Sequence, residues 1–216
     1  MNEADKYLVE RNGTGSAPPV PFNTAICRNP DTVKERVPCT KCAQQVGTGG
    51  RIMTLFGLTL LSGLFAIVAA VVRQLTIGFP DILAAVIVAP PVEEILKVSI
   101  PIMVLEHRAS WIDKGRALLF FAMGSALVFA VVENLLYTFI YLKNPSAELL
   151  WWRWIVCTAM HVVASGLVGV GLMRAFSRGQ RDNQSPRFVW EWPWLAAAIA
   201  VHMAYNTFAV FFAEPF

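Results

Sequence analysis

Charged side chains are scarce in this chain, which excludes an ordinary soluble domain. Asp, Glu, Lys and Arg make up 15% of the 216 residues, whereas 56% are hydrophobic. A soluble domain carries about a quarter charged residues. No run of basic residues is interleaved with aromatic ones, so no nucleic-acid partner is expected. The strict alternation of polar and apolar side chains that builds membrane barrels is also missing.

Several familiar catalytic motifs are missing as well. The chain has three histidines and no His-Glu-x-x-His pair, so it is not a zinc metalloprotease of the usual motif. No glycine-rich phosphate-binding loop is present, which argues against nucleotide hydrolysis. A Ser-His-Asp set is not apparent, because Ser165 beside His161 has no orienting acid on its own segment.

Long apolar segments, by contrast, are abundant. Five of them have about 20 residues or more, which is enough to cross a bilayer as a helix. The expected spans are residues 52–72, 82–105, 117–142, 154–173 and 194–212. Helices satisfy their own backbone polar groups in lipid. We therefore expect an all-α fold, a polytopic transmembrane helix bundle.

The distribution of Lys and Arg predicts the orientation of this bundle. Seven precede the first span, three follow the second and four follow the fourth, all on one side of the membrane. The opposite side has only Arg73, Lys143 and Arg153. Cytoplasmic loops carry the excess of Lys and Arg. The sequence thus predicts a multi-pass protein of the cell membrane with its N-terminus in the cytoplasm and its C-terminus outside.

Residues 1–50 are polar, rich in Gly, Pro, Asn and Thr, and are expected to form a mostly disordered cytoplasmic tail. The tail has no apolar core of signal-peptide type, so the first span is expected to be an uncleaved anchor. It contains Cys27, Cys39 and Cys42, but no histidine. Structural zinc usually takes four ligands. These cysteines therefore have no fixed role, form a partial or intermolecular metal site, or take part in redox chemistry.

Ionisable groups interrupt the last four spans. Each such group costs about 2.5–3.5 kcal/mol at the bilayer centre. They are therefore expected to face each other, water, or polar groups on other helices rather than lipid. The groups are Glu93, Glu94 and Lys97 in the second span, Glu133 in the third, His161 in the fourth and His202 in the fifth.

The second span also contains Pro90-Pro91. Because proline lacks a backbone donor and restricts the residue before it, we expect a break there and a new helix near Pro91. Glu93 and Glu94 would then lie in the first turn, where the helix dipole favours carboxylates. Lys97 can pair with either glutamate, at four-residue or three-residue spacing. The alternative is a simple proline kink.

The ionisable groups of the four spans lie at similar expected depths in the membrane. At 1.5 Å per residue, the acids and imidazoles lie about 11–18 Å from the outer ends of their helices. Glu133 shares a helical face with Tyr137 and lies beside Asn134, and His202 shares a face with Asn206. This common depth favours one polar site near the middle of the bilayer. Separate structural contacts between helices are the alternative.

Such a site has the groups needed for hydrolysis. A glutamate can accept a proton from water, and an imidazole can orient the water or protonate the leaving amine. Asn206 and a protonated imidazole can stabilise an oxyanion. Alternatively, Glu94, His161 and His202 can hold one zinc ion with an open position for water. A membrane transporter or proton pathway, or a non-catalytic membrane scaffold, would use the same residue types.

Four ordered motifs identify a family. Glu93-Glu94-x-x-Lys97, Glu133-Asn134-x-x-Tyr137, His161 and His202-x-x-x-Asn206 resemble the motifs of the PrsW intramembrane proteases. These are distantly similar to the CAAX prenyl protease and bacteriocin-processing superfamily. In the CAAX-type relatives the first motif ends in arginine one residue later and the second carries histidine, so Lys97 and Glu133 favour the PrsW branch.

The resemblance implies that residues 51–216 form a transmembrane protease-like domain. Its substrate would be a membrane-anchored protein, such as an anti-sigma factor, cut outside or near the outer face. Glu93 or Glu94 would be the general base, and His161 and His202 would orient water, stabilise the oxyanion or bind metal. Glu133 would complete the polar cluster. Both a metalloprotease and a metal-free glutamic protease fit these residues.

Overall fold

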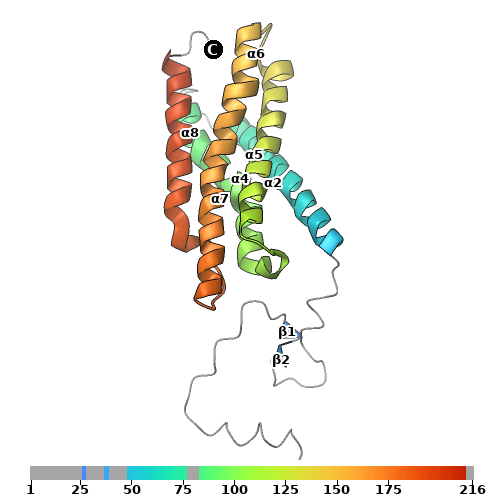
Figure 1. Ribbon diagram of the computed structural model, residues 1–216. Helices are drawn as coiled ribbons and strands as arrows, with labels where there is room; N and C mark the ends of the chain where they lie inside the picture. The colour runs from blue at the N-terminus through green and yellow to red at the C-terminus, as the bar shows by residue number, and fades with distance from the viewer. Residues whose placement is uncertain (1–25, 28–36, 39–47, 77–82, 213–216) are drawn as a thin grey trace, which may run out of the picture.

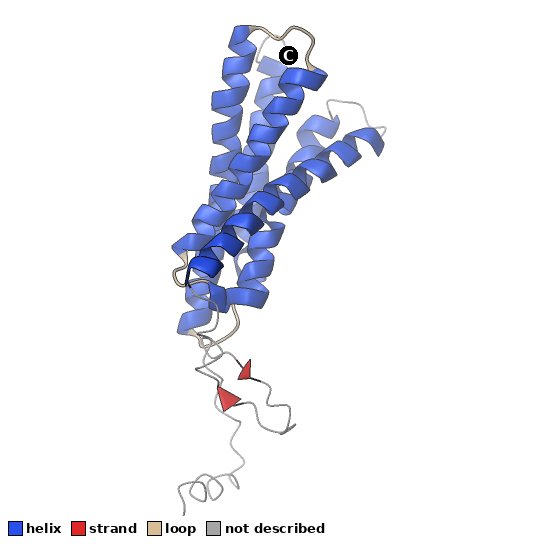
Figure 2. Ribbon diagram, turned by 90° about the vertical axis from the view of Figure 1, so that its right-hand side faces the viewer, coloured by secondary structure: helices blue, strands red, loops and turns tan. Residues whose placement is uncertain are grey.

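The computed structural model describes residues 26–27, 37–38, 48–76 and 83–212. Almost all of this is helical (Figure 2). The long helices in the described part are α2 (Thr48–Thr76), α4 (Ala89–Arg108), α5 (Arg116–Leu136), α7 (Thr158–Arg181) and α8 (Trp192–Phe212). The all-helical architecture expected from the apolar segments is thus confirmed for the described residues.

Shorter elements connect or extend the long helices. A short α-helix, α6 (Ala147–Trp151), precedes the wider π-helical segment η6 (Trp152–Cys157). Two further π-helical segments are η3 (Ala84–Val88) and η5 (Tyr137–Tyr141). The 3-10 turns are η4 (Ala109–Trp111) and η7 (Phe188–Glu191). Long π-helical turns are rare and occur often at functional sites.

The five long helices run alternately up and down (Figure 1). The start of α2, the α4–α5 connection and the α7–α8 connection lie at one end, and the α5–α6 connection lies at the other. α2 crosses the other helices obliquely in both views (Figure 2). Among the described elements, α4 contacts each of α2, α5, α7 and α8. The helix with the two adjacent glutamates is therefore the central one.

Glycines allow the helices to approach closely. A Cβ atom added at Gly63 of α2 would lie 2.7 Å from the backbone oxygen of Ser125 on α5. One added at Gly169 of α7 would lie 2.9 Å from the Cα of Leu119 on α5. In lipid, small residues at such contacts let helix backbones pack against each other.

The structure has no break in the helix at Pro90-Pro91, contrary to the expectation. The chain stays helical through both prolines, and only the helix type changes, from the π-helical η3 to the α-helical α4 at Ala89. Glu93 and Glu94 consequently do not lie in the first turn of α4, contrary to the sequence-based expectation. Because the helix is continuous, Pro90 does remove a backbone donor there, and Asn206 of α8 supplies a donor to the carbonyl of Ala85 instead.

Neighbouring helices replace the backbone donors that prolines remove. Pro101 lies inside α4 and cannot donate to the carbonyl of Lys97, four residues earlier. The hydroxyls of Ser62 on α2 and Ser125 on α5 each donate to this carbonyl at 2.7 Å. The backbone of Lys97 is thereby tied to two other helices.

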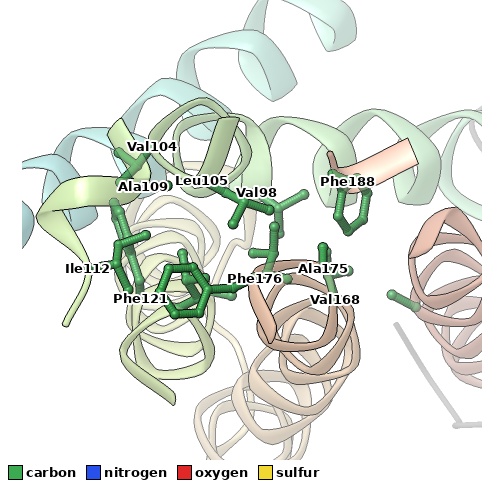
Figure 3. Close-up of a cluster of buried hydrophobic side chains, with 14 of the residues drawn as sticks. Val98, Val104, Leu105, Ala109, Ile112, Phe121, Val168, Ala175, Phe176 and Phe188 are labelled. Carbon is green, nitrogen blue, oxygen red and sulfur yellow. The ribbon is translucent and has the colours of Figure 1, made fainter. Parts of the chain in front are cut away.

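A cluster of apolar side chains fills the end of the bundle beyond this point. It comprises buried residues of α4, α5 and α7 together with Phe188 of η7 (Figure 3). Val98 and Leu105 of α4 and Val168 of α7 are at most 1% exposed. The buried ionisable residues of α4, Glu93, Glu94 and Lys97, lie in the other half of the helix.

Within the part of the chain that the structure describes, three helical stretches are long and apolar enough to cross a membrane: Arg116–Tyr141, Ala147–Arg181 and Phe188–Phe211. They correspond to the third, fourth and fifth spans expected from the sequence. A shorter apolar stretch, Met53–Ile67, lies in α2, where the first span was expected.

Most of the expected N-terminal tail lies outside the described residues, as do Cys39 and Cys42. The described residues of the tail form two strands of two residues each, β1 (Ile26–Cys27) and β2 (Val37–Pro38), which pair antiparallel.

Candidate active site

Glu94 is the centre of a buried polar network. It is fully buried, and its Oε1 lies 2.5 Å from the Lys97 ammonium and 2.8 Å from His202 Nδ1. Its Oε2 accepts a hydrogen bond of 3.0 Å from the Ser165 hydroxyl. These partners come from α4, α7 and α8, so one carboxylate joins three helices. A buried carboxylate is stable in such a place only with charge and hydrogen-bond partners of this kind.

Lys97 extends the network to a second imidazole. Its ammonium, also fully buried, lies 2.9 Å from His161 Nδ1 and 4.5 Å from the centre of the Phe129 ring. The other ring nitrogen of His161, Nε2, lies 3.2 Å from Glu133 Oε2 on α5. The expectation that Lys97 pairs with one glutamate is met by Glu94, at three-residue spacing.

The imidazoles of His161 and His202 are in edge-to-face contact. The ring centres of His161 and His202 are 4.8 Å apart, and the rings are nearly perpendicular at 87°. His202 Nε2 points toward Glu93, with 3.8 Å between the nitrogen and Oε2. That distance is too long for a direct hydrogen bond. Glu93, His161 and His202 are all at most 5% exposed.

The Glu133 side of the network is more open. The Glu133 side chain is 18% exposed, and its Oε2 lies 3.5 Å from Arg153 Nη2 and 3.9 Å from Cys157 Sγ. The Arg153 guanidinium lies 3.5 Å from the centre of the Tyr137 ring. Arg153 and Cys157 belong to the π-helical η6, and Tyr137 begins the π-helical η5.

The expected supporting amides bind backbone rather than the acids. Asn206 donates a 2.8 Å hydrogen bond to the carbonyl of Ala85 in η3. Because η3 is π-helical, that carbonyl would otherwise pair with the nitrogen of Pro90, which carries no hydrogen. Asn134 donates to the Arg153 carbonyl at 3.1 Å and to Thr158 Oγ1 at 3.0 Å. Both amides position the elements that carry the site.

Among the described residues, two groups of side chains could hold a metal ion. The possible ligand atoms of Glu93, His161 and His202 lie within 4.8 Å of one another, and so do those of Glu133, Cys157 and His161. One carboxylate and two imidazoles are a common ligand set for catalytic zinc, so the first group fits this metal chemically. The sequence-based set contained Glu94 in place of Glu93, but both Glu94 oxygens are engaged with Lys97, His202 and Ser165.

Sequence reasoning missed several members of the network. Arg153 was counted only as a charge in a loop, because η6 lies at the edge of an apolar segment. Ser165 lies on the same helical face as His161, but its hydrogen bond to Glu94, 71 residues earlier in the chain, was not predicted. Ser62 gave no signal, since a serine in an apolar span is common.

A family model described as PrsW family intramembrane metalloprotease matches residues 49–216, which is more than half of the chain. Comparison with curated proteins and with solved structures gave no match. The match covers all five long helices except the first residue of α2, and it covers every member of the polar network.

Proposed function

Because the chain belongs to the PrsW family of intramembrane metalloproteases, we propose that it hydrolyses a peptide bond of a membrane-anchored protein at the Glu93–His161–His202 cluster. The observation that carries this proposal is the meeting of two imidazoles, from α7 and α8 and 4.8 Å apart, with three buried or partly buried carboxylates, two from α4 and one from α5. A helix bundle that needed only packing would not place five acid and base groups in one cluster, given the cost of each.

In this proposal, Glu93, His161 and His202 hold the metal ion. A zinc ion held there supplies an activated water and polarises the carbonyl of the substrate. Glu94 holds His202 through Nδ1, so the opposite nitrogen of the same ring faces Glu93. A carboxylate behind a ligating histidine fixes the orientation of the ring.

Glu133 is the group we assign as general base. It is the most exposed of the three carboxylates at 18%, and it lies next to His161. It can accept the proton of the attacking water and pass it to the leaving amine. Lys97 lies between Glu94 and His161 and offsets the negative charge of the buried carboxylates.

The membrane setting is also part of the proposal. We assign α2 and α4 as further spans, giving five, with the acids and imidazoles near the middle of the bilayer. The α4–α5 and α7–α8 connections, in which basic residues are frequent, lie at one end of the bundle (Figure 1), which supports a cytoplasmic location for that end. Protease added to intact cells should remove a tag after Phe216 and spare a tag before Met1.

The substrate class follows from the membrane setting and the family. We propose a single-span, membrane-anchored protein, with anti-sigma factors as the first class to test. The test is cleavage of an anchored reporter by purified protein in liposomes. Glu93→Gln and Glu133→Gln should each lower the rate by roughly 10²-fold or more. The matched control is Glu148→Gln, which alters an exposed glutamate of α6.

A chelator separates the two protease mechanisms. Removal of metal should abolish cleavage, and zinc should restore it. Cleavage that survives complete metal removal would instead assign Glu93 as the base of a metal-free glutamic protease. Loss of proton or solute flux in the same variants, with no proteolysis by the wild type, would favour a transporter.

A further inference from the structure

Cys157 lies beside the proposed site, and the proposed reaction does not use it. The side chain is buried, and its sulfur lies 3.9 Å from Glu133 Oε2. His161 Nε2 lies 3.2 Å from the same carboxylate oxygen. The possible ligand atoms of Glu133, Cys157 and His161 all lie within 4.8 Å of one another. The cluster around His161 therefore has a second side, which differs from the first by containing a thiol.

The chemistry of this second side favours a soft divalent ion. Thiolate ligands select zinc, cadmium and similar ions over magnesium or calcium. A thiolate and a carboxylate together balance the two positive charges of the ion, which suits a buried position. When the ion binds, a metal–sulfur bond forms and the thiol proton is released to solvent. The hydrogen on His161 Nε2 moves to Nδ1, and the Lys97 ammonium keeps its contact with Glu94.

Two cations oppose an incoming ion. Arg153 Nη2 lies 3.5 Å from the Glu133 oxygen, and the Lys97 ammonium lies 2.9 Å from His161 Nδ1. Arg153 is 13% exposed and can turn toward solvent, whereas Lys97 is fully buried. Because Nδ1 faces Lys97, Nε2 is the His161 nitrogen that faces a metal on either side. It can bind one only with the ring hydrogen on Nδ1 rather than on Nε2.

From this geometry we infer that Glu133, Cys157 and His161 form a second, inhibitory binding position for a soft divalent ion such as Cd²⁺ or excess Zn²⁺. Occupation of this position excludes occupation of the Glu93–His161–His202 position, because both need His161 Nε2. It also engages Glu133, the assigned base. The inhibitory consequence depends on the proposed function, but ion binding itself does not.

The test begins with a full-length parent protein in which Cys27, Cys39 and Cys42 are changed to serine, so that Cys157 is the one remaining thiol. Titration with Cd²⁺ should produce the ultraviolet charge-transfer band of a cadmium–thiolate bond, saturating at one ion per chain. Cys157→Ser and Cys157→Ala should abolish the band. Glu133→Gln should weaken binding by roughly ten-fold, about 1.4 kcal/mol. A parent protein that shows no band would overturn the proposal.

Reporter cleavage provides the second readout. Cd²⁺ should inhibit the parent, and Cys157→Ser should keep the basal rate while losing the inhibition. Equal inhibition of both proteins would contradict the inhibitory role. If the parent protein cleaves no reporter, the proposed function fails, while the thiolate band still decides whether the second ion position exists.

Discussion

Two glutamate–histidine pairs of the same composition lie in different surroundings. Glu94 and His202 are at most 2% exposed, and Glu94 has partners on three helices. Glu133 and His161 are joined by a longer contact of 3.2 Å, and the Glu133 side chain is 18% exposed. Glu133 therefore has more freedom than Glu94 to move and to contact a substrate, although both are glutamates paired with a histidine.

This difference suggests a division of labour between the two pairs. A carboxylate held by an ammonium, an imidazole and a hydroxyl orients its neighbours, because both of its oxygens are already engaged with them. A partly exposed carboxylate beside π-helical segments can accept a proton from bound water. We therefore expect substitutions of Glu94 to lower stability as well as turnover, and those of Glu133 to lower turnover with little change in stability.

The largest effect on stability should come from Lys97→Met. The substitution removes the cation that faces both pairs and leaves Glu94 buried without its charge partner. Breaking a buried pair in this way costs about 3–5 kcal/mol. Thermal unfolding in detergent measures it, with the exposed Lys143→Met as control. Equal unfolding temperatures for the two variants would show that the network does not stabilise the fold.

A separation of turnover from stability is expected for Glu133→Gln. Loss of a general base lowers the rate by roughly 10²–10⁴-fold. Since Glu133 is partly exposed and its contact with Arg153 is 3.5 Å, unfolding should change by no more than about 1 kcal/mol. Glu94→Gln should instead lower both quantities. The comparison breaks down if Glu133→Gln unfolds as readily as Glu94→Gln.

The contact between α2 and α5 supports the Glu94–His202 pair, because both helices hold the backbone of Lys97. Gly63→Ala would place a Cβ atom 2.7 Å from the Ser125 backbone oxygen, and Ser125 donates to the Lys97 carbonyl. Overpacking of this kind costs about 1–3 kcal/mol. At Gly57 an added Cβ atom meets nothing within 4 Å, so Gly57→Ala is the matched control. Comparable unfolding of the two alanine variants would argue against close packing there.

The smallest effect on stability is expected from Arg153→Gln. Its contact with Glu133 is long and partly exposed, and such pairs contribute about 0–1 kcal/mol. The exposed Arg116→Gln provides the control for unfolding in detergent. A loss of stability comparable to that of Lys97→Met would show that the Glu133–His161 pair is held as tightly as the Glu94–His202 pair.

Much of the site was predictable because lipid makes polar side chains conspicuous. An acid or imidazole in an apolar span needs a partner, and equal depth on four alternating helices predicted that these partners are each other. The described geometry brings Glu94, Lys97, His161 and His202 into contact as that argument requires. Their catalytic role stays a prediction.

The assignment of individual partners could not be predicted. Glu93 and Glu94 are adjacent, and both lie within reach of Lys97 along a helix. Only the positions of α7 and α8 decide that Ser165 and His202 meet Glu94. The continuous helix at Pro90 was also beyond sequence reasoning, because the amide of Asn206 comes from a helix more than a hundred residues away.

Substitution of each of the three histidines of the chain tests most directly whether the acids and imidazoles form one hydrolytic site. His161→Ala and His202→Ala remove the two facing imidazoles, whereas His107→Ala removes an exposed one at the end of α4. In the liposome assay, the first two should abolish reporter cleavage and the third should leave the rate unchanged. Normal cleavage by a folded His161→Ala or His202→Ala protein would contradict the existence of a shared hydrolytic site.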